Sequence, residues 1–222
     1  MRTTFFFLLT ILCLALTASA QIIYNDGGID GNDNAFFVTG PAFPNFLGSV
    51  QDISNGFVAE SSSSGSPTLE WGEWSVGAPT SFAWSLGSAA FGADLGSGTV
   101  AQNGFNSRFL FTNALGYGIY DVRVGLVDVR FLTAGQTYWL SISNATGGGD
   151  DGTQAWDVPN GGLGGPAICN FRQSGTNFGD CGLGGESFTI DNPPTTPEPS
   201  SILLFGSGIL GIAGTLRRKL NR

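Results

Sequence analysis

The sequence contains no histidine, so its 222 residues lack the commonest general base and a common metal ligand. Ser-His-Asp and Cys-His hydrolases and histidine-ligated zinc sites are therefore excluded. Chemistry based on two carboxylic acids, as in a glycosidase, remains open. Four acidic residues are candidates for such a pair, but their spacing in the sequence does not by itself bring any two together: Glu70, Glu73, Asp94 and Asp157.

Charged residues are also scarce, at 12% of the chain, and basic residues are fewer than acidic ones. Residues 21–196 contain four arginines and sixteen acidic residues, a net charge of −12. Because phosphate backbones repel so acidic a surface, nucleic acid is excluded as a partner. The other basic residues are Arg2, before one apolar run, and a cluster at 217–222, after another. This segregation is typical of segments that meet a membrane.

The first twenty residues have the three parts of a secretory signal peptide. Arg2 gives the basic start, residues 5–16 form the apolar run, and Ala18-Ser19-Ala20 is a small-residue cleavage site. We predict export through the Sec translocon and removal of residues 1–20 by signal peptidase. The mature chain then begins at Gln21.

Cysteine is rare, and only Cys169 and Cys181 remain once Cys13 has left with the signal peptide. Exported proteins meet an oxidising environment, so we predict a disulfide between these two residues that closes a glycine-rich loop. A metal site at the pair would need further cysteine or histidine ligands, which the sequence lacks.

The last residues of the chain form a second targeting signal. A Pro and Thr spacer, residues 192–196, precedes Pro197, Glu198 and Pro199, and an apolar segment follows at 202–216. As a helix that segment would rise about 22 Å, short of the roughly 30 Å hydrocarbon core, which suits temporary retention in the inner membrane. The prolines hold the motif extended and outside the helix. The basic cluster at 217–222, which contains Arg217, Arg218 and Lys219, is expected to stay cytoplasmic.

In this order of parts, residues 197–222 resemble the PEP-CTERM sorting signal, the substrate tail of exosortases in Gram-negative bacteria that make exopolysaccharide. The resemblance implies recognition at Pro197-Glu198-Pro199, removal of the helix, and delivery of the protein to the cell surface or extracellular matrix. The alternative is a plain C-terminal membrane anchor.

Residues 21–191 are expected to form one all-β domain, an antiparallel β-sandwich or jelly roll. The chain has 35 glycines and no long glycine-free stretch with helical periodicity before the tail, as in a protein of many strands and tight turns. Alternation is clearest at 120–126, where the apolar phase then slips and predicts a bulge or corner near Leu126–Asp128. We expect residues 123–142 to form a hairpin-like pair. Further strands are expected at 57–59, 69–76, 81–86, 98–102, 108–112 and 187–190.

Parts of this body also resemble the β-sandwich ectodomain common among PEP-CTERM proteins. The segments that carry the resemblance are Leu132–Ile142, Trp156-Asp157 and Glu186–Ile190. It supports the sandwich fold and implies no activity.

The segment Asn25–Asn34 is rich in Asp, Asn and Gly, the oxygen donors and flexible backbone that Ca²⁺ prefers. Asp26, Asp30 and Asn32 are the candidate ligands, and an ordinary turn is the alternative. The five tryptophans, at 71, 74, 84, 139 and 156, are expected mainly in the core, with stacking on sugar rings as the alternative. Residues 61–66, rich in serine, are expected to form a flexible loop.

Two functional classes follow for the body. The first is a non-catalytic surface or matrix module associated with exopolysaccharide. The second is a secreted carbohydrate-binding or carboxylate-dependent polysaccharide-acting enzyme. No cofactor is expected beyond the calcium considered above.

Overall fold

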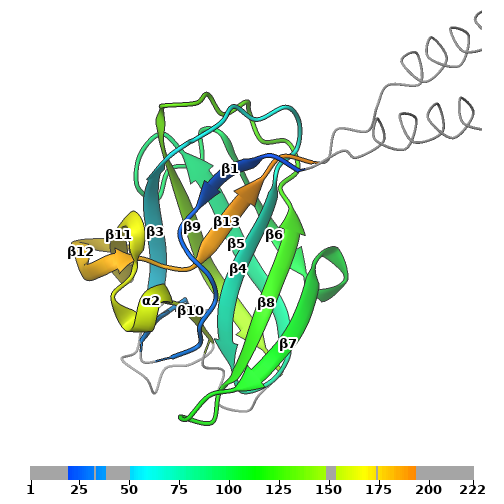
Figure 1. Cartoon of the computed structure of the whole chain (residues 1–222), viewed down its shortest axis with the longest axis vertical. Coiled ribbons are helices and arrows are strands. Elements are labelled where there is room, and N and C mark those ends of the chain that lie inside the picture. Colours follow the sequence, from blue (N-terminus) through cyan, green and yellow to red (C-terminus); the bar gives the residue numbers. More distant parts are fainter. Residues whose placement is uncertain (1–19, 33, 39–50, 149–153, 174, 194–222) are drawn as a thin grey trace, which may run out of the picture. The chain divides into compact units, whose positions relative to one another are not determined.

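Alternating apolar residues build two antiparallel sheets, which face each other across a common core (Figure 1). The computed structural model describes residues 20–32, 34–38, 51–148, 154–173 and 175–193. These belong to a compact unit, Gln21–Pro193, except for Ala20, which belongs with the two chain ends. Apart from Ala20, the predicted signal peptide lies outside the described residues, as do the segment 202–216 and the basic cluster. No helix among the described residues is long and apolar enough to cross a membrane.

The elements are short, as the frequent glycines predict. The seven strands of the first sheet are β1 (Ile22–Asn25), β2 (Ala35–Phe37), β4 (Thr68–Ser75), β7 (Asn106–Thr112), β8 (Gly118–Gly125), β10 (Gln154–Asp157) and β13 (Phe188–Asp191). The six strands of the second are β3 (Gln51–Val58), β5 (Pro79–Gly87), β6 (Gly96–Ala101), β9 (Thr137–Gly147), β11 (Gly165–Gln173) and β12 (Thr176–Gly185). A 3-10 turn, η1 (Gln102–Gly104), and a one-turn helix, α2 (Pro159–Gly162), complete the described elements.

The seven-stranded sheet is built around β4. One edge of β4 pairs along its whole length with β8, which in turn pairs with β7. The other edge is divided: β13 pairs with Thr68–Trp71 and β10 with Glu73–Ser75. Beyond them, β13 pairs with β1 and β10 with β2. The division falls at Gly72, so two strands from distant parts of the sequence meet there.

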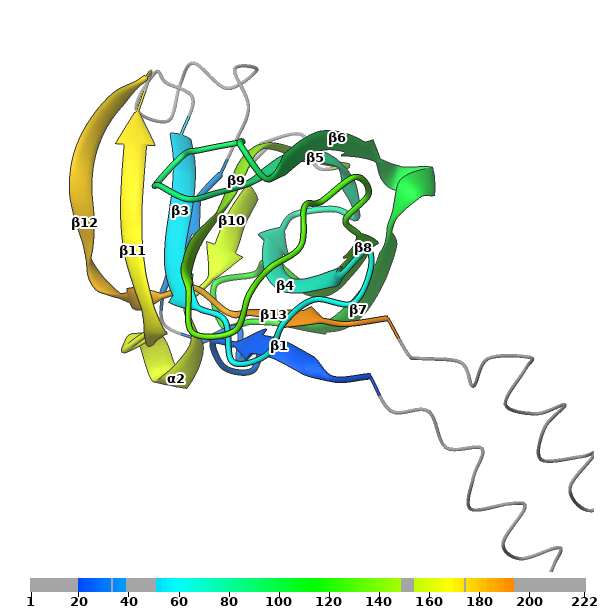
Figure 2. The same cartoon turned by 90° about the horizontal axis from the view of Figure 1, so that it is seen from above.

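The six-stranded sheet runs in the order β12, β11, β3, β9, β5, β6. Seen from above, β11 and β12 lie at one side beyond β3 (Figure 2). Their outer residues are correspondingly exposed, with Ile168 60% and Phe178 56% accessible. The hairpin extends the sheet to the side and places its glycine-rich end next to the start of β13.

Large aromatic side chains fill the space between the sheets. Trp71 on β4 meets Phe82 on β5 edge to face, with ring centroids 5.3 Å apart, and so joins the two layers. Trp71 also meets Trp156 on β10 at 5.8 Å. All three side chains are fully buried, and each contributes roughly 2 to 3 kcal/mol through its buried surface.

Several sequence predictions are confirmed. The fold is all-β with two antiparallel sheets, and β3 to β7 and β13 overlap the six additional predicted strand ranges. A corner follows β8 as predicted, because the strand ends at Gly125 and Asp128 has a left-handed φ of 57°.

The predicted hairpin over residues 123–142 is wrong. β8 pairs with β4 and β7, whereas β9 pairs with β3 and β5 in the other sheet. The intervening segment 126–136 crosses from one layer to the other. An alternating pattern shows which side chains face the core, but it does not show which strand lies beside them.

The glycine-rich region around the two cysteines was predicted to be a loop, and this prediction is also wrong. It forms the β11–β12 hairpin, which pairs from Gly165 opposite Gly185 to Gln173 opposite Thr176 with several register shifts. Small residues without alternation give no strand signal, although their backbones pair well.

The serine run was expected to be a flexible loop, but it fastens the two ends of the domain. The Ser61 hydroxyl donates to the Ile22 carbonyl oxygen at 2.7 Å, and the backbone N–H of Ser64 donates to Oδ1 of Asn192 at 2.7 Å. The backbone N–H of Asn192 donates to the Gln21 carbonyl at 2.8 Å. Asn192, with which the predicted spacer begins, is 3% exposed. The chain therefore enters and leaves this unit at adjacent points.

Candidate functional site

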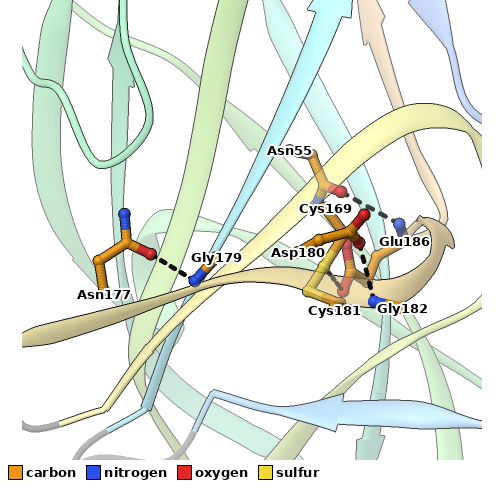
Figure 3. Close-up of a disulfide and its surroundings, with 8 residues drawn as sticks. All are labelled: Asn55, Cys169, Asn177, Gly179, Asp180, Cys181, Gly182 and Glu186. Atoms are coloured by element: carbon orange, nitrogen blue, oxygen red, sulfur yellow. Dashed lines mark hydrogen bonds between the residues drawn. A yellow bond between two sulfur atoms is a disulfide. The ribbon is translucent and has the colours of Figure 1, made fainter.

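The disulfide predicted from the sequence joins Cys169 on β11 to Cys181 on β12, with Cα atoms 5.4 Å apart (Figure 3). Cys169 is fully buried. Among the described residues, Cys169, Cys181 and Glu186 form the one group of three cysteine or acidic side chains with ligand atoms within 4.8 Å of one another. Because the two sulfur atoms are bonded to each other, the group offers no thiolate to a metal ion.

Glu186 lies directly behind the disulfide and is completely buried. Its Oε1 atom is 3.0 Å from Sγ of Cys169, and its backbone N–H donates to Oδ1 of Asn55 at 3.3 Å. A disulfide sulfur has no hydrogen, so only a protonated Glu186 can donate a hydrogen bond at this contact. Burial raises the pKa of Glu186 to about 8, which agrees with a neutral carboxyl group at pH 7.

Asp26 is a second buried acid in the same part of the interior. Its Oδ1 accepts from the Tyr24 hydroxyl at 2.6 Å and from the backbone N–H of Ala167 at 2.8 Å. Burial raises its pKa to about 6, against the lowering effect of these two hydrogen bonds. Within the described part of the chain, Asp26 Oδ2, Glu186 Oε2 and Asn55 Nδ2 have no hydrogen-bond partner. A Cβ atom at Gly185 would lie 2.2 Å from Asp26 Oδ2, so only glycine allows this close approach.

The structure separates the three predicted calcium ligands. Asp26 points into the interior, while Asp30 accepts from the backbone N–H of Asn32 at 3.0 Å and of Gly161 at 2.7 Å. Asn32 is exposed. Two of the three side chains thus hold the backbone in place, and calcium binding stays a prediction.

Asp157 accepts hydrogen bonds from several segments at the point where β10 and β13 meet beside β4. Its carboxylate accepts from Trp74 Nε1 at 2.7 Å, from the backbone N–H groups of Asp30 and Gly31 at 3.0 and 3.1 Å, and from the Ser187 hydroxyl at 3.3 Å. Burial raises the pKa of Asp157, and the hydrogen bonds from Trp74 and Asp30 oppose that rise. This acid is structural: it binds the 26–32 segment to the sheet.

The other candidate acids lie in different surroundings. Glu70 is paired with Arg123 at 2.9 Å on the outer face, and Asp94 accepts from the backbone N–H of Ser88 in an exposed loop at 2.9 Å. Glu73 is 1% exposed, and burial raises its pKa well above the usual value. Neither carboxyl oxygen of Glu73 has a partner among the described residues. Sequence reasoning did not single out Glu186, because nothing in its local sequence indicates that the disulfide covers it.

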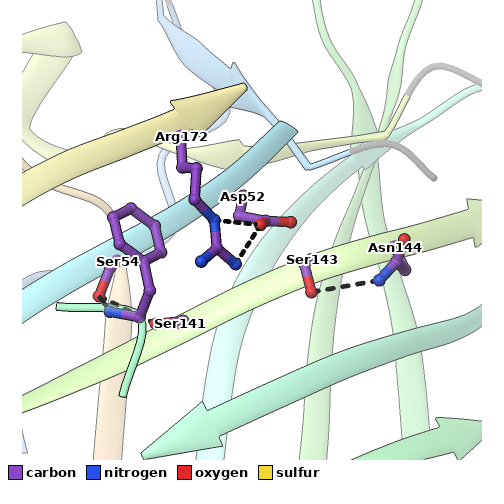
Figure 4. Close-up of polar contacts among 7 residues, drawn as sticks. Asp52, Ser54, Ser141, Ser143, Asn144 and Arg172 are labelled. Atoms are coloured by element: carbon purple, nitrogen blue, oxygen red, sulfur yellow. Dashed lines mark hydrogen bonds and ion pairs between the residues drawn. The ribbon is translucent and has the colours of Figure 1, made fainter. Parts of the chain in front are cut away.

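Four of the five tryptophans are core residues, as expected, and Trp139 alone is half-buried. It lies on the outer face of the six-stranded sheet across Gly56, where an added Cβ would be 2.8 Å from the indole ring. Nearby on this face, Arg172 reaches from β11 to Asp52 on β3, with Nε 2.8 Å from Oδ2 (Figure 4). The guanidinium also stacks over Phe91 at 4.5 Å, and the backbone N–H of Phe91 donates to the Ser54 hydroxyl. The loop that contains Phe91 therefore packs onto this face.

Described residues line two hollows on the outer face of the seven-stranded sheet. One, of about 300 Å³, is lined by residues of β7 and β8 that include Asn106, Arg108 and Arg123. The other, of about 230 Å³, lies between the 25–29 segment and the sheet, and includes Glu70 and Thr189 in its lining. The Arg123–Glu70 ion pair lies where the two hollows adjoin.

Comparison with known protein families finds a PEP-CTERM protein-sorting motif at residues 195–219. The match includes Pro197-Glu198-Pro199, the apolar segment 202–216 and Arg217-Arg218-Lys219. No curated protein and no solved structure matches the chain. The motif implies export, anchoring of the tail in the membrane and processing by an exosortase. All of its residues lie outside the described part of the structure.

Proposed function

We propose that this exported chain, whose tail carries a PEP-CTERM protein-sorting motif, is a non-catalytic component of the cell surface or extracellular matrix. After an exosortase cleaves the tail, the β-sandwich associates with the extracellular polysaccharide of the producing bacterium. The observation that carries the proposal is the sorting motif at 195–219. Export, a temporary anchor and processing are the steps that bring a protein to that location.

The environments of the acidic residues support a role without catalysis. A glycosidase needs two carboxyl groups about 5 to 10 Å apart on either side of a bound sugar. Here Glu70 forms an ion pair with Arg123, and Asp157 already accepts several hydrogen bonds from the protein. Glu73 is buried in the interior. Each of the three has a role or a location that does not suit attack on a sugar.

The sorting step is tested with Glu198→Ala in the full-length protein. We expect this variant to be exported but to remain in the inner membrane with its tail attached, whereas Glu60→Ala, an exposed acid on the domain, is processed normally. Cell fractionation and intact mass distinguish the two. Normal processing of Glu198→Ala would show that this glutamate is not part of the recognised motif.

The matrix role is tested by location and by turnover. The processed protein is expected in the polysaccharide fraction and is expected to be released when that polysaccharide is digested. Incubation with the purified polysaccharide should generate no new reducing ends. Recovery of the protein only in the free medium would contradict the association, and new reducing ends would contradict the non-catalytic role.

A further inference from the structure

A single row of polar side chains crosses the outer face of the seven-stranded sheet. Strand register places Asn106 opposite Arg123, Arg123 opposite Glu70, Glu70 opposite Thr189, and Thr189 opposite Asn25. These five residues come from β7, β8, β4, β13 and β1 and occupy successive strands. With strands about 4.8 Å apart, the row is about 19 Å long.

All five residues point away from the core. Most of their neighbours along the strands, such as Val122 and Val124 beside Arg123 or Leu69 and Trp71 beside Glu70, are buried between the sheets, whereas Asn106 lies between buried Phe105 and exposed Ser107. Side chains alternate along a strand, so the row faces outward. The two hollows lie along it: Asn106 and Arg123 line one, and Glu70, Thr189 and Asn25 line the other. The row therefore links the two hollows across five strands, and the row with its two hollows is called the groove below.

The chemistry of the groove suits hydroxyl groups. Amide, guanidinium, carboxylate and hydroxyl groups alternate along it, so that donors and acceptors are both within reach of a chain rich in hydroxyls. Ile29 adds an apolar wall to the second hollow. This is the usual character of a specific site, a concave surface with a few convergent polar groups.

The charge of the groove indicates a neutral ligand. Arg108 and Arg123 pair with Asp121, and Arg123 also pairs with Glu70, so two cations face two anions. The body around the groove is strongly acidic, and a polyanionic chain would be repelled from it.

We propose that this groove binds a neutral polysaccharide chain laid across the strands. The inference rests on the proposed function, since it names the surface through which the domain meets extracellular polysaccharide. Asn106 and Thr189 anchor the chain, one in each hollow, and the Arg123–Glu70 pair hydrogen-bonds the sugars between them.

The test is a binding isotherm of the protein purified from its producing strain. The probes are that strain's extracellular polysaccharide, dextran as a neutral glucan and alginate as a polyuronate. The variant Asn106→Ala/Thr189→Ala removes one anchor from each hollow. Its matched control, Asn103→Ala/Thr99→Ala, makes the same substitutions at exposed positions on η1 and β6.

We expect the wild type and the control to bind the strain's polysaccharide equally and the groove variant to bind about tenfold more weakly, the effect of losing hydrogen bonds at two sites. Alginate should not bind more tightly than dextran. All substituted residues are exposed or half-exposed, so the melting temperatures should agree. If the double variant unfolds, the single variants Asn106→Ala and Thr189→Ala give the same readout, each with about threefold weaker binding.

The outcomes distinguish a failure of the groove proposal from a failure of the proposed matrix role. If the groove variant binds as tightly as the wild type, the groove proposal fails while the matrix role stands. Tighter binding of alginate than of dextran overturns the choice of a neutral ligand. If the wild type binds none of the three polysaccharides, both the groove and the polysaccharide association fail.

Discussion

Asp157 and Glu186 are both completely buried next to Ser187, which donates to Asp157 and follows Glu186 in the chain, but their carboxyl groups have different partners. Asp157 accepts hydrogen bonds from four donors and connects three separate segments of the chain. The Glu186 carboxyl group faces the disulfide, while the backbone N–H of Glu186 donates to the Asn55 amide oxygen, and one carboxyl oxygen has no partner among the described residues.

Burial raises the pKa of both acids, but the hydrogen bonds from Trp74 and Asp30 oppose that rise at Asp157. Donors that surround a carboxylate replace the water it loses, so the group stabilises the fold. A carboxyl group without such donors avoids the cost of charge burial by staying protonated, and its contribution becomes sensitive to pH. The two acids should therefore respond differently to substitution and to pH.

Asp157→Ala should have the largest effect. The substitution leaves Trp74 Nε1 and the N–H groups of Asp30 and Gly31 without their acceptor in the interior, and we expect a loss of about 4 kcal/mol in the free energy of unfolding. Chemical denaturation measures it. The control is Asp94→Ala, which removes an exposed acid and should leave the denaturation midpoint nearly unchanged. Similar values for the two variants would contradict the structural role of Asp157.

Removal of the disulfide, as Cys169→Ala/Cys181→Ala, should cost about 3 kcal/mol, the value for a closed loop of this length, which spans 12 residues. The same loss should follow when the wild type is unfolded with its disulfide reduced. A double variant as stable as the wild type would show that strand pairing alone holds β11 to β12.

Glu186→Gln should raise stability at alkaline pH, because the amide stays neutral where the carboxyl group must ionise. The pKa of Glu186 is about 8 in the folded protein against the usual 4.5, so the folded state holds an extra proton between these values. The stabilisation that comes from this proton is complete below about pH 4.5 and disappears as the pH rises through 8. The wild type should therefore lose stability between about pH 5 and 9, and the difference from the variant should grow over that range. A difference that is independent of pH would mean that Glu186 does not titrate there.

The smallest effect is expected for Asn192→Ala, about 1 kcal/mol, because it removes the hydrogen bonds of Oδ1 with Ser64 and of Nδ2 with the Ser62 carbonyl. Amide hydrogen exchange should increase in β1 and β13 while the β11–β12 hairpin is unaffected. Faster exchange throughout the domain would contradict a local role for this residue.

The sequence patterns that were informative are those whose physical cause is local. Alternation at 120–126 reflects one strand with one buried face, and the disulfide follows from two cysteines in an exported chain. The pairing of β8 with β4 depends on residues some fifty positions away, so the alternation did not reveal it. The hairpin of β11 and β12 was missed because its glycines show no alternation.

The candidate sites were harder to predict from the sequence, because their residues lie far apart in the chain. Asp157 meets Trp74, which is 83 positions away, and the N–H of Asp30, which is 127 away. The polar row from Asn106 to Asn25 exists only because the register of four strand pairs aligns its members. No single-strand pattern contains that alignment.

The adjacent entry and exit of the chain at Gln21 and Asn192 also have a mechanical consequence. Any tension carried by the tail reaches the domain at the end of β13, which lies between β1 and β4 and is antiparallel to both. A pull along the strand loads the hydrogen bonds on its two edges together, as shear, instead of opening them one after another from an end. The tail therefore follows a strand that is hydrogen-bonded along both of its edges.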